Sequence, residues 1–148
     1  MTTPSRTMPS RTIRASAVEL VVADMRASVA FYRRLGVDFA SDTDDHEEAE
    51  LAPGLRLMLD TEASLASFAP GWVRPTGSAR ASLAFEVGTP AEVDALHAEL
   101  VAAGAHSELE PWDAFWGQRY ASLTDPDGNG IDIHAPLDAA RATSDPEG

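Results

Sequence analysis

The sequence predicts an α+β fold made of two successive modules, each with the order strand, helix, strand, strand, strand. Two observations carry this prediction. An alternating, β-branched segment followed by a capped helix occurs twice, at Val18 and again at Leu83, about 65 residues later. Each helix ends at a glycine and is followed by short strand-like segments separated by turn residues. The pattern therefore indicates an internal duplication.

The length limits how this duplication can be organised. A chain of 148 residues can bury one sizeable core but not two large ones. Both ends lack a periodic apolar pattern and are predicted to be a flexible arm and a flexible tail. We therefore expect an arm at 1–12, a single domain at 13–137 and a tail at 138–148, with modules at about 13–61 and 80–137 and a connector at 62–79.

The first module begins with an alternating strand at 17–23. Asp24 is a suitable N-cap for a helix at 25–35, and Gly36 stands where a helix commonly ends. Ser28, Phe31, Tyr32 and Leu35 share one face of this helix, which should pack on a sheet. Three strands are then predicted, at Val37 to Ala40, Glu48 to Ala52 and Leu55 to Asp60, the last two joined by a Pro-Gly turn.

The second module repeats this order. A strand is predicted at 81–87, and Thr89, Pro90 and Glu92 have the form of a capping box with proline at the first helical position. The helix runs to Ala103 and ends at Gly104. Strands follow at about 105–110, 118–124 and 130–136, and the last two are joined by the turn Asp-Pro-Asp-Gly-Asn-Gly at 125–130.

The two-residue period of a strand assigns side chains to the two faces of the sheet. The bulky apolar set of each strand should face its helix, as Val18, Leu20 and Val22 do in the first strand. The opposite face then collects Glu19, Glu86, Asp132 and His134. Such a face is either solvated or forms the polar floor of a pocket. His134 could act there as a general base or as a hydrogen-bond donor.

Composition excludes several classes of function. The formal net charge is −13 and all eleven cations are arginine, which disfavours nucleic acid and anionic membranes as partners. The charge either favours a neutral or cationic ligand or serves solubility alone. Without cysteine there is no disulfide, thiolate metal site or thiol nucleophile. No apolar run is long enough to span a membrane, so a cytoplasmic protein is expected.

Aromatic and acidic residues gather in predicted loops. Trp112, Phe115 and Trp116 lie within five residues, and Trp72 lies in the connector. Such side chains can stack on planar or cationic ligands, or they can seal a dimer interface or cap the core. Arg119 either contacts the ligand or pairs with a carboxylate of the sheet.

The run 42–50 holds six acids in nine positions, which either form a solvated loop or attract a cation. His97 is expected at the surface.

Three features together resemble the vicinal oxygen chelate superfamily, which includes glyoxalase I, extradiol dioxygenases, fosfomycin-resistance transferases and bleomycin-resistance proteins. They are the two modules, the segment LVVADMRASVAFYRRLG at 20–36 and the segment DPDGNGIDI at 125–133. The resemblance implies that the modules form a U-shaped mixed sheet around a cavity. The segment PWDAFWGQRY at 111–120 is similar to a stretch of the bleomycin-resistance proteins, which are homodimers that bind a cationic aromatic drug.

The same resemblance identifies where metal ligands would stand. The usual positions hold Ala17, Met58, Ser82 and Asp132, of which only the last is a good ligand. We therefore expect no metal and no other cofactor. The alternative is one divalent metal ion at a displaced site formed by Glu19, Glu86, Asp132 and His134.

These observations favour a metal-independent binding protein over an enzyme, and predict that it sequesters an aromatic, cationic compound such as an antibiotic. A homodimer is expected. No catalytic residue is assigned, and the predicted ligand-binding residues are Trp72, Trp112, Phe115, Trp116, Arg119, Glu19, Glu86, Asp132 and His134. The alternative function is that of a metal-dependent lyase, isomerase or dioxygenase of the superfamily. A domain that binds a partner protein or a biosynthetic intermediate is a third possibility.

Overall fold

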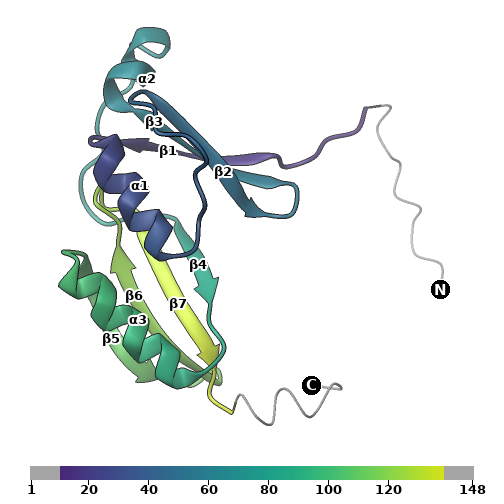
Figure 1. The fold of residues 1–148 in the computed structure, drawn as a ribbon, viewed down its shortest axis with the longest axis vertical. Coiled ribbons are helices and arrows are strands. Elements are labelled where there is room, and N and C mark those ends of the chain that lie inside the picture. Colours follow the sequence, from purple (N-terminus) through teal and green to yellow (C-terminus); the bar gives the residue numbers. More distant parts are fainter. Residues whose placement is uncertain (1–10, 139–148) are drawn as a thin grey trace.

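The computed structural model describes residues 11–138 and has the predicted α+β class (Figure 1). The predicted arm and tail lie almost wholly outside these residues. The described part contains no helix long and apolar enough to cross a membrane. The elements, in chain order, are β1 (Ala17–Val22), α1 (Met25–Arg34), β2 (His46–Ala52), β3 (Leu55–Thr61), α2 (Glu62–Phe68), β4 (Ser82–Glu86), α3 (Pro90–Ala102), β5 (His106–Asp113), β6 (Gln118–Thr124) and β7 (Gly130–Pro136).

The first module forms a three-stranded sheet in the order β1-β3-β2, with β1 parallel and β2 antiparallel to β3. The strand predicted at 37–40 is wrong, because this segment is irregular. Val37 and Phe39 are buried in the core, and Arg33 Nη2 donates to the Phe39 carbonyl oxygen at 2.9 Å. The apolar residues of the segment therefore pack in the core. The hydrogen bond that a neighbouring strand would give to the Phe39 carbonyl comes instead from the Arg33 side chain.

The second module forms a four-stranded sheet in the order β4-β7-β6-β5, and its three later strands lie where they were predicted. The strands are thus hydrogen-bonded as two sheets, of three and four strands, and not as one continuous sheet. The connector holds the short helix α2, which the sequence pattern did not predict. Its N-cap is Thr61, whose hydroxyl accepts from Ser64 N at 3.1 Å.

The two modules share one apolar core and are joined by the turn at 125–130. The core combines Leu57 and Leu59 of the first sheet with Ile131 and Ile133 of the second. Tyr32 of α1 donates its hydroxyl to Asp125 Oδ2 at 2.5 Å, and both groups are buried. Asp125 also accepts from Asp127 N, Asn129 N and Asn129 Nδ2, each at 2.9 Å. This carboxylate therefore shapes the turn and holds it against the first module.

Candidate functional site

The free face of the second sheet is its side away from α3, which packs on the other side (Figure 1). Ile131 and Ile133 are buried on the helix side, and Asp132 and His134, which alternate with them along β7, are half-buried. His134 stands opposite Glu86 of β4, and Asp132 stands opposite Ala84. The predicted face assignment is correct for this sheet, and three of the four predicted polar residues lie together.

Asp132 lies at the centre of a group of hydroxyls on this face. Ser122 Oγ donates to Asp132 Oδ1 at 3.0 Å, and Ser82 Oγ donates to Asp132 Oδ2 at 3.2 Å. Burial and a hydrogen bond with Asp132 raise the pKa of Tyr120 to about 12, so its phenol stays protonated at neutral pH. Tyr120 was not predicted as a site residue. Its position two residues before Ser122 on β6 places it on the same face, which is the signal that could have identified it.

A second chain of polar contacts connects this face to the β5–β6 hairpin. Gln118 Nε2 lies 3.1 Å from His134 Nδ1, and Trp116 Nε1 donates to Gln118 Oε1 at 2.8 Å. Gln118 stands two residues from Tyr120 along β6 and therefore shares its face. The position of the Trp116 ring is thus coupled to His134 through a single glutamine, which the sequence analysis also missed.

Four rings form what we call the aromatic cluster: Trp112, Phe115, Trp116 and Tyr120. Trp116 is its centre, with ring centroids 5.5 Å from Trp112, 4.9 Å from Phe115 and 5.2 Å from Tyr120, all in edge-to-face geometry. Phe115 is 90% exposed and Trp116 is 48% exposed. Gly117 closes the hairpin with a φ of 94°, a conformation that favours glycine. The predicted aromatic residues of this segment therefore form one exposed surface beside Asp132 and His134.

Arg119 does not belong to this surface. Its side chain alternates with that of Tyr120 along β6, and its Nε donates to Asp94 Oδ1 of α3 at 2.9 Å. Its Nη1 donates to Asp113 Oδ1 of β5, also at 2.9 Å. Of the two predicted roles, the structure shows the ion pairing, with one carboxylate of the sheet and one of the helix.

Glu19 and Trp72 lie elsewhere. They line a cavity of about 350 Å³ between β1, the connector and the turn at 125–130. Glu86, Asp132 and His134 do not line this cavity. The structure therefore divides the predicted ligand-binding residues among three places. Glu19 and Trp72 line this cavity, Arg119 pairs with Asp94 and Asp113, and the other residues lie on or beside the free face of the second sheet.

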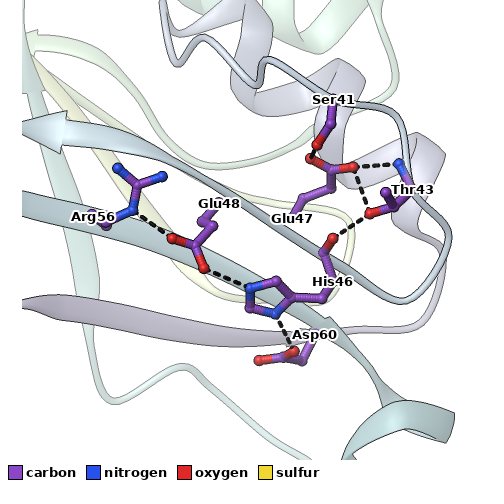
Figure 2. A network of polar contacts seen from close by, with 7 residues as sticks. All are labelled: Ser41, Thr43, His46, Glu47, Glu48, Arg56 and Asp60. Atoms are coloured by element: carbon purple, nitrogen blue, oxygen red, sulfur yellow. Dashed lines mark hydrogen bonds and ion pairs between the residues drawn. The ribbon is translucent and has the colours of Figure 1, made fainter.

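Glu19 also takes part in a network on the free face of the first sheet, most of which Figure 2 shows. His46 Nδ1 lies 2.6 Å from Asp60 Oδ1 and its Nε2 lies 2.8 Å from Glu48 Oε2. Arg56 Nε donates to Glu48 Oε1 at 2.6 Å. We call these four residues together with Glu19 the first-sheet network. Its charges are largely satisfied by one another.

The protonation states of the first-sheet network follow from these contacts. Hydrogen bonds with Glu48 and Asp60 raise the pKa of His46. A hydrogen bond with Asp60, burial and the Asp60 charge raise the pKa of Glu19. Burial acts to raise the pKa of Asp60, but the hydrogen bonds with Glu19 and His46 outweigh it and lower that pKa. We infer that, in the pair formed by Glu19 and Asp60, Asp60 is the carboxylate anion and Glu19 is the acid that holds a proton more strongly.

The acidic run at 42–50 has, in part, a structural role. Glu47 is 1% exposed and accepts from Ser41 Oγ at 2.9 Å and from the backbone and hydroxyl of Thr43 (Figure 2). Glu48 is held by His46 and Arg56. These two carboxylates are therefore committed to internal contacts and are not free to attract a ligand.

The residues at the superfamily's metal positions do not fit a divalent ion. Ala17 offers no donor, Met58 offers only a thioether, and Ser82 already donates its hydroxyl to Asp132. Within residues 11–138, no three histidine, aspartate or glutamate side chains are arranged to hold a metal ion. The displaced site suggested from Glu19, Glu86, Asp132 and His134 is not assembled among these residues either, because Glu19 makes its hydrogen bond with Asp60, away from the other three, which lie together on β4 and β7.

Known structures resemble this fold. A glyoxalase/bleomycin resistance protein/dioxygenase family enzyme from Burkholderia phytofirmans PsJN is 22% identical, with a TM-score of 0.72, over 82% of this chain and 98% of that one. A glyoxalase-related enzyme from Fulvimarina pelagi is 23% identical, with a TM-score of 0.72, over 82% and 87% of the two chains. A glyoxalase/bleomycin resistance protein/dioxygenase from Nocardioides is 27% identical, with a TM-score of 0.67, over 88% and 87%.

A comparison with curated proteins finds no significant match. A comparison with family models agrees with the structural likeness. Residues 14–133 match the family model of the glyoxalase/bleomycin resistance protein/dioxygenase superfamily. This match covers nearly all of the predicted domain and both modules. The chain therefore belongs to the glyoxalase/bleomycin resistance protein/dioxygenase superfamily.

Proposed function

We propose that the protein binds and sequesters a planar, cationic small molecule on the free face of its second sheet, without a metal ion. The observation that supports this most directly is the exposed aromatic cluster, which lies beside the polar residues of β4 and β7. A monomer rarely leaves a phenylalanine 90% exposed next to tryptophans that are 48% and 36% exposed unless the surface meets a ligand or a partner.

The chemistry of this face suits such a ligand. Stacking on Trp116 and Phe115 would bind a planar ring, and the ring faces would attract its positive charge. Asp132 and Glu86 would supply negative charge beside the ring. Their positions on neighbouring strands are fixed by the sheet register, with Ala84 opposite Asp132 and Glu86 opposite His134. Preformed positions reduce the entropy cost of binding.

Metal independence is proposed from the donor set. Three of the four usual ligand positions hold Ala17, Met58 and Ser82, so a metal-dependent lyase or dioxygenase has no support from the geometry at that place. Elemental analysis of the purified protein tests this step. Nickel, zinc, manganese or iron held in stoichiometric amount through dialysis would overturn the metal-free proposal and favour the enzymatic alternative.

We also propose that the protein acts as a homodimer in which the aromatic cluster lies near the subunit interface. Trp112, Phe115 and Trp116 all come from the β5–β6 hairpin, and Leu109 of β5 is 48% exposed on the same hairpin. Apolar side chains of this kind are enriched at interfaces. Sedimentation equilibrium should give twice the chain mass of 15.7 kDa, and a purely monomeric protein would contradict this step.

Ligand binding is tested by titration with bleomycin and with the planar cation proflavine, followed by tryptophan fluorescence and by calorimetry. We expect quenching with at least one of them and an affinity about tenfold lower for Trp116→Ala, because this ring is the centre of the cluster. Phe68→Ala is the matched control, because Phe68 is 65% exposed on α2 and lies outside the cluster. Equal affinities in the two variants would contradict the proposed site.

A further inference from the structure

The cavity that Glu19 and Trp72 line lies beside β1, which is an edge strand of its sheet. Glu19 and Val21 of β1 form one wall, Trp72 and Arg74 of the connector form another, and the turn at 125–130 closes it. A volume of about 350 Å³ falls in the range of small-molecule sites, roughly 300–1,000 Å³. The proposed function does not use this cavity, whose tryptophan belongs to a different part of the chain from the aromatic cluster.

The lining combines an indole ring with three carboxylates, those of Glu19, Glu62 and Asp127. Asp127 is held in a fixed orientation, because Ala23 N donates to its Oδ1 at 2.9 Å and Ser28 Oγ donates to its Oδ2 at 3.3 Å. An aromatic face next to oriented carboxylates is the usual environment for an organic cation. The chemistry of the cavity is therefore complementary to positive charge.

Two of these carboxylates are poorly stabilised as anions. Burial raises the pKa of Asp127, and the nearby charges of Asp125 and Glu62 raise it further against the effect of its hydrogen bonds. The pKa of Glu19 is raised mainly by its hydrogen bond with Asp60. A bound cation would offset this repulsion, so its binding would be coupled to the ionisation of these groups.

The chain itself places one planar cation in this cavity. Arg74 Nε donates to Glu62 Oε2 at 2.8 Å, and Arg74 Nη2 donates to Glu62 Oε1 at 2.5 Å. This two-pronged contact raises the pKa of Arg74, and the charge of Asp127 adds to the effect. The cavity therefore accommodates a guanidinium, and an incoming cation of similar shape would compete with Arg74 for Glu62.

We propose that this cavity is a second binding site, which takes a small aromatic compound carrying an amidinium or guanidinium group. The ring of the ligand stacks on Trp72, and its cationic group meets Glu19, Asp127 and Glu62. Arg74 belongs to the chain itself, competes with the ligand for Glu62 and neutralises part of the negative charge of the cavity.

The test is calorimetric titration with benzamidine, compared with benzamide, which has a similar shape but no charge. We expect benzamidine to bind and benzamide to bind at least tenfold more weakly. Trp72→Ala and Glu62→Gln should each lower the benzamidine affinity severalfold, whereas Arg74→Gln should raise it. Arg34→Gln is the matched control, because it removes another exposed arginine–glutamate pair, that of Arg34 and Glu99, which lies outside this cavity and outside the first-sheet network. It should leave the affinity unchanged.

Two further measurements separate this site from the proposed function. Trp116→Ala should not change benzamidine affinity, whereas a loss in that variant and none in Trp72→Ala would assign the probe to the aromatic cluster and overturn the second site. When benzamidine binds at pH 5, Glu19 and Asp127 should release protons, and the measured enthalpy should therefore depend on the buffer. At pH 8 no protons should be released on binding. Equal affinities for benzamide and benzamidine, or a weaker affinity in Arg74→Gln, would also overturn the proposal.

Discussion

The free faces of the two sheets differ in how their polar groups are satisfied. On the first sheet, the partners of His46 are Asp60 and Glu48, and Glu48 also binds Arg56. On the second sheet, the partners of Asp132 within the described residues are the hydroxyls of Ser82, Ser122 and Tyr120, and Glu86 is exposed at the edge strand. The first face neutralises its own charges, whereas the second leaves negative charge beside exposed aromatic rings.

This difference separates two uses of the same kind of surface. A network of opposite charges in mutual contact stabilises the fold but has little capacity left for a ligand. A carboxylate among hydroxyls and aromatic rings keeps its charge available for a cation. Substitutions of the paired residues His46, Glu48, Arg56 and Asp60 on the first face should therefore change stability, and those on the second should change binding.

The largest expected effect is that of Asp60→Ala on stability. The Asp60 side chain is 8% exposed and lies between His46 and Glu19, so its removal leaves Glu19 without its main partner and His46 with one of its two partners. We expect the free energy of unfolding to fall by about 2–3 kcal/mol in urea titrations. Asp113→Ala is the control, since its contact with Arg119 is largely exposed, and it should cost less than about 1 kcal/mol. Similar losses in both variants would remove the contrast between the faces.

Phe115→Ala should show the opposite behaviour. The ring is 90% exposed, so its loss should change the free energy of unfolding by no more than about 0.5 kcal/mol. The affinity for a planar cation should nevertheless fall about threefold to tenfold, because one side of the Trp116 ring loses its neighbour. Urea titration and calorimetry on the same sample measure both quantities. A destabilised variant with unchanged affinity would show that the aromatic cluster is structural.

The first-sheet network should make stability depend on pH through His46. The folded pKa of His46 is raised, so its stabilising contribution is complete below the unfolded pKa of about 6.5 and is lost as the pH rises through the folded pKa. The stability advantage of the wild type over His46→Gln should therefore be larger at pH 5.5 than at pH 9. Because the His46 side chain is 40% exposed, the change should not exceed about 1 kcal/mol. A constant advantage across this range would contradict the assigned partners.

The smallest expected effect is that of Glu86→Gln. Glu86 is exposed on β4 opposite His134, so it should contribute attraction at a distance more than direct contact. We expect about a twofold loss of affinity for proflavine at low salt and no loss at about 0.5 M salt. Glu50→Gln, an exposed acid on β2, is the matched control. Equal losses in both variants would indicate that only the net charge matters.

Local patterns predicted most of the fold. The caps Asp24 and Thr89 and the alternation in β1, β4 and β7 identified the helices and the strands that pack against them. Two segments differ from the local prediction: a strand was predicted at 37–40 that does not form, and the helix α2 forms although it was not predicted. Val37 and Phe39 alternate as in a strand, but they are buried without a neighbouring strand. The residues of α2 lack a clear amphipathic pattern, and their helix is started by the hydroxyl of Thr61.

The prediction of His97 at the surface was also wrong. His97 is 6% exposed, and its Nε2 lies 2.8 Å from Ser107 Oγ of β5. It lies on the same stripe of α3 as Val93 and Leu100, which are fully buried. A polar residue within such a stripe can be buried when the neighbouring strand offers a hydrogen-bond partner, and this partner cannot be read from the helix alone.

The sequence by itself determined the strand and capped helix that open each module, the faces of β1, β4 and β7, and the aromatic character of the β5–β6 hairpin. These properties depend on neighbours that are close in the chain, for which period and capping are sufficient. Only the tertiary structure decided that Glu19 and Trp72 lie apart from Asp132 and His134, and that Arg119 pairs with Asp94 of α3. Whether two strands of similar pattern share a sheet depends on hydrogen-bond pairing between segments that are distant in the chain. The alternation of side chains along each strand does not show which strand it pairs with.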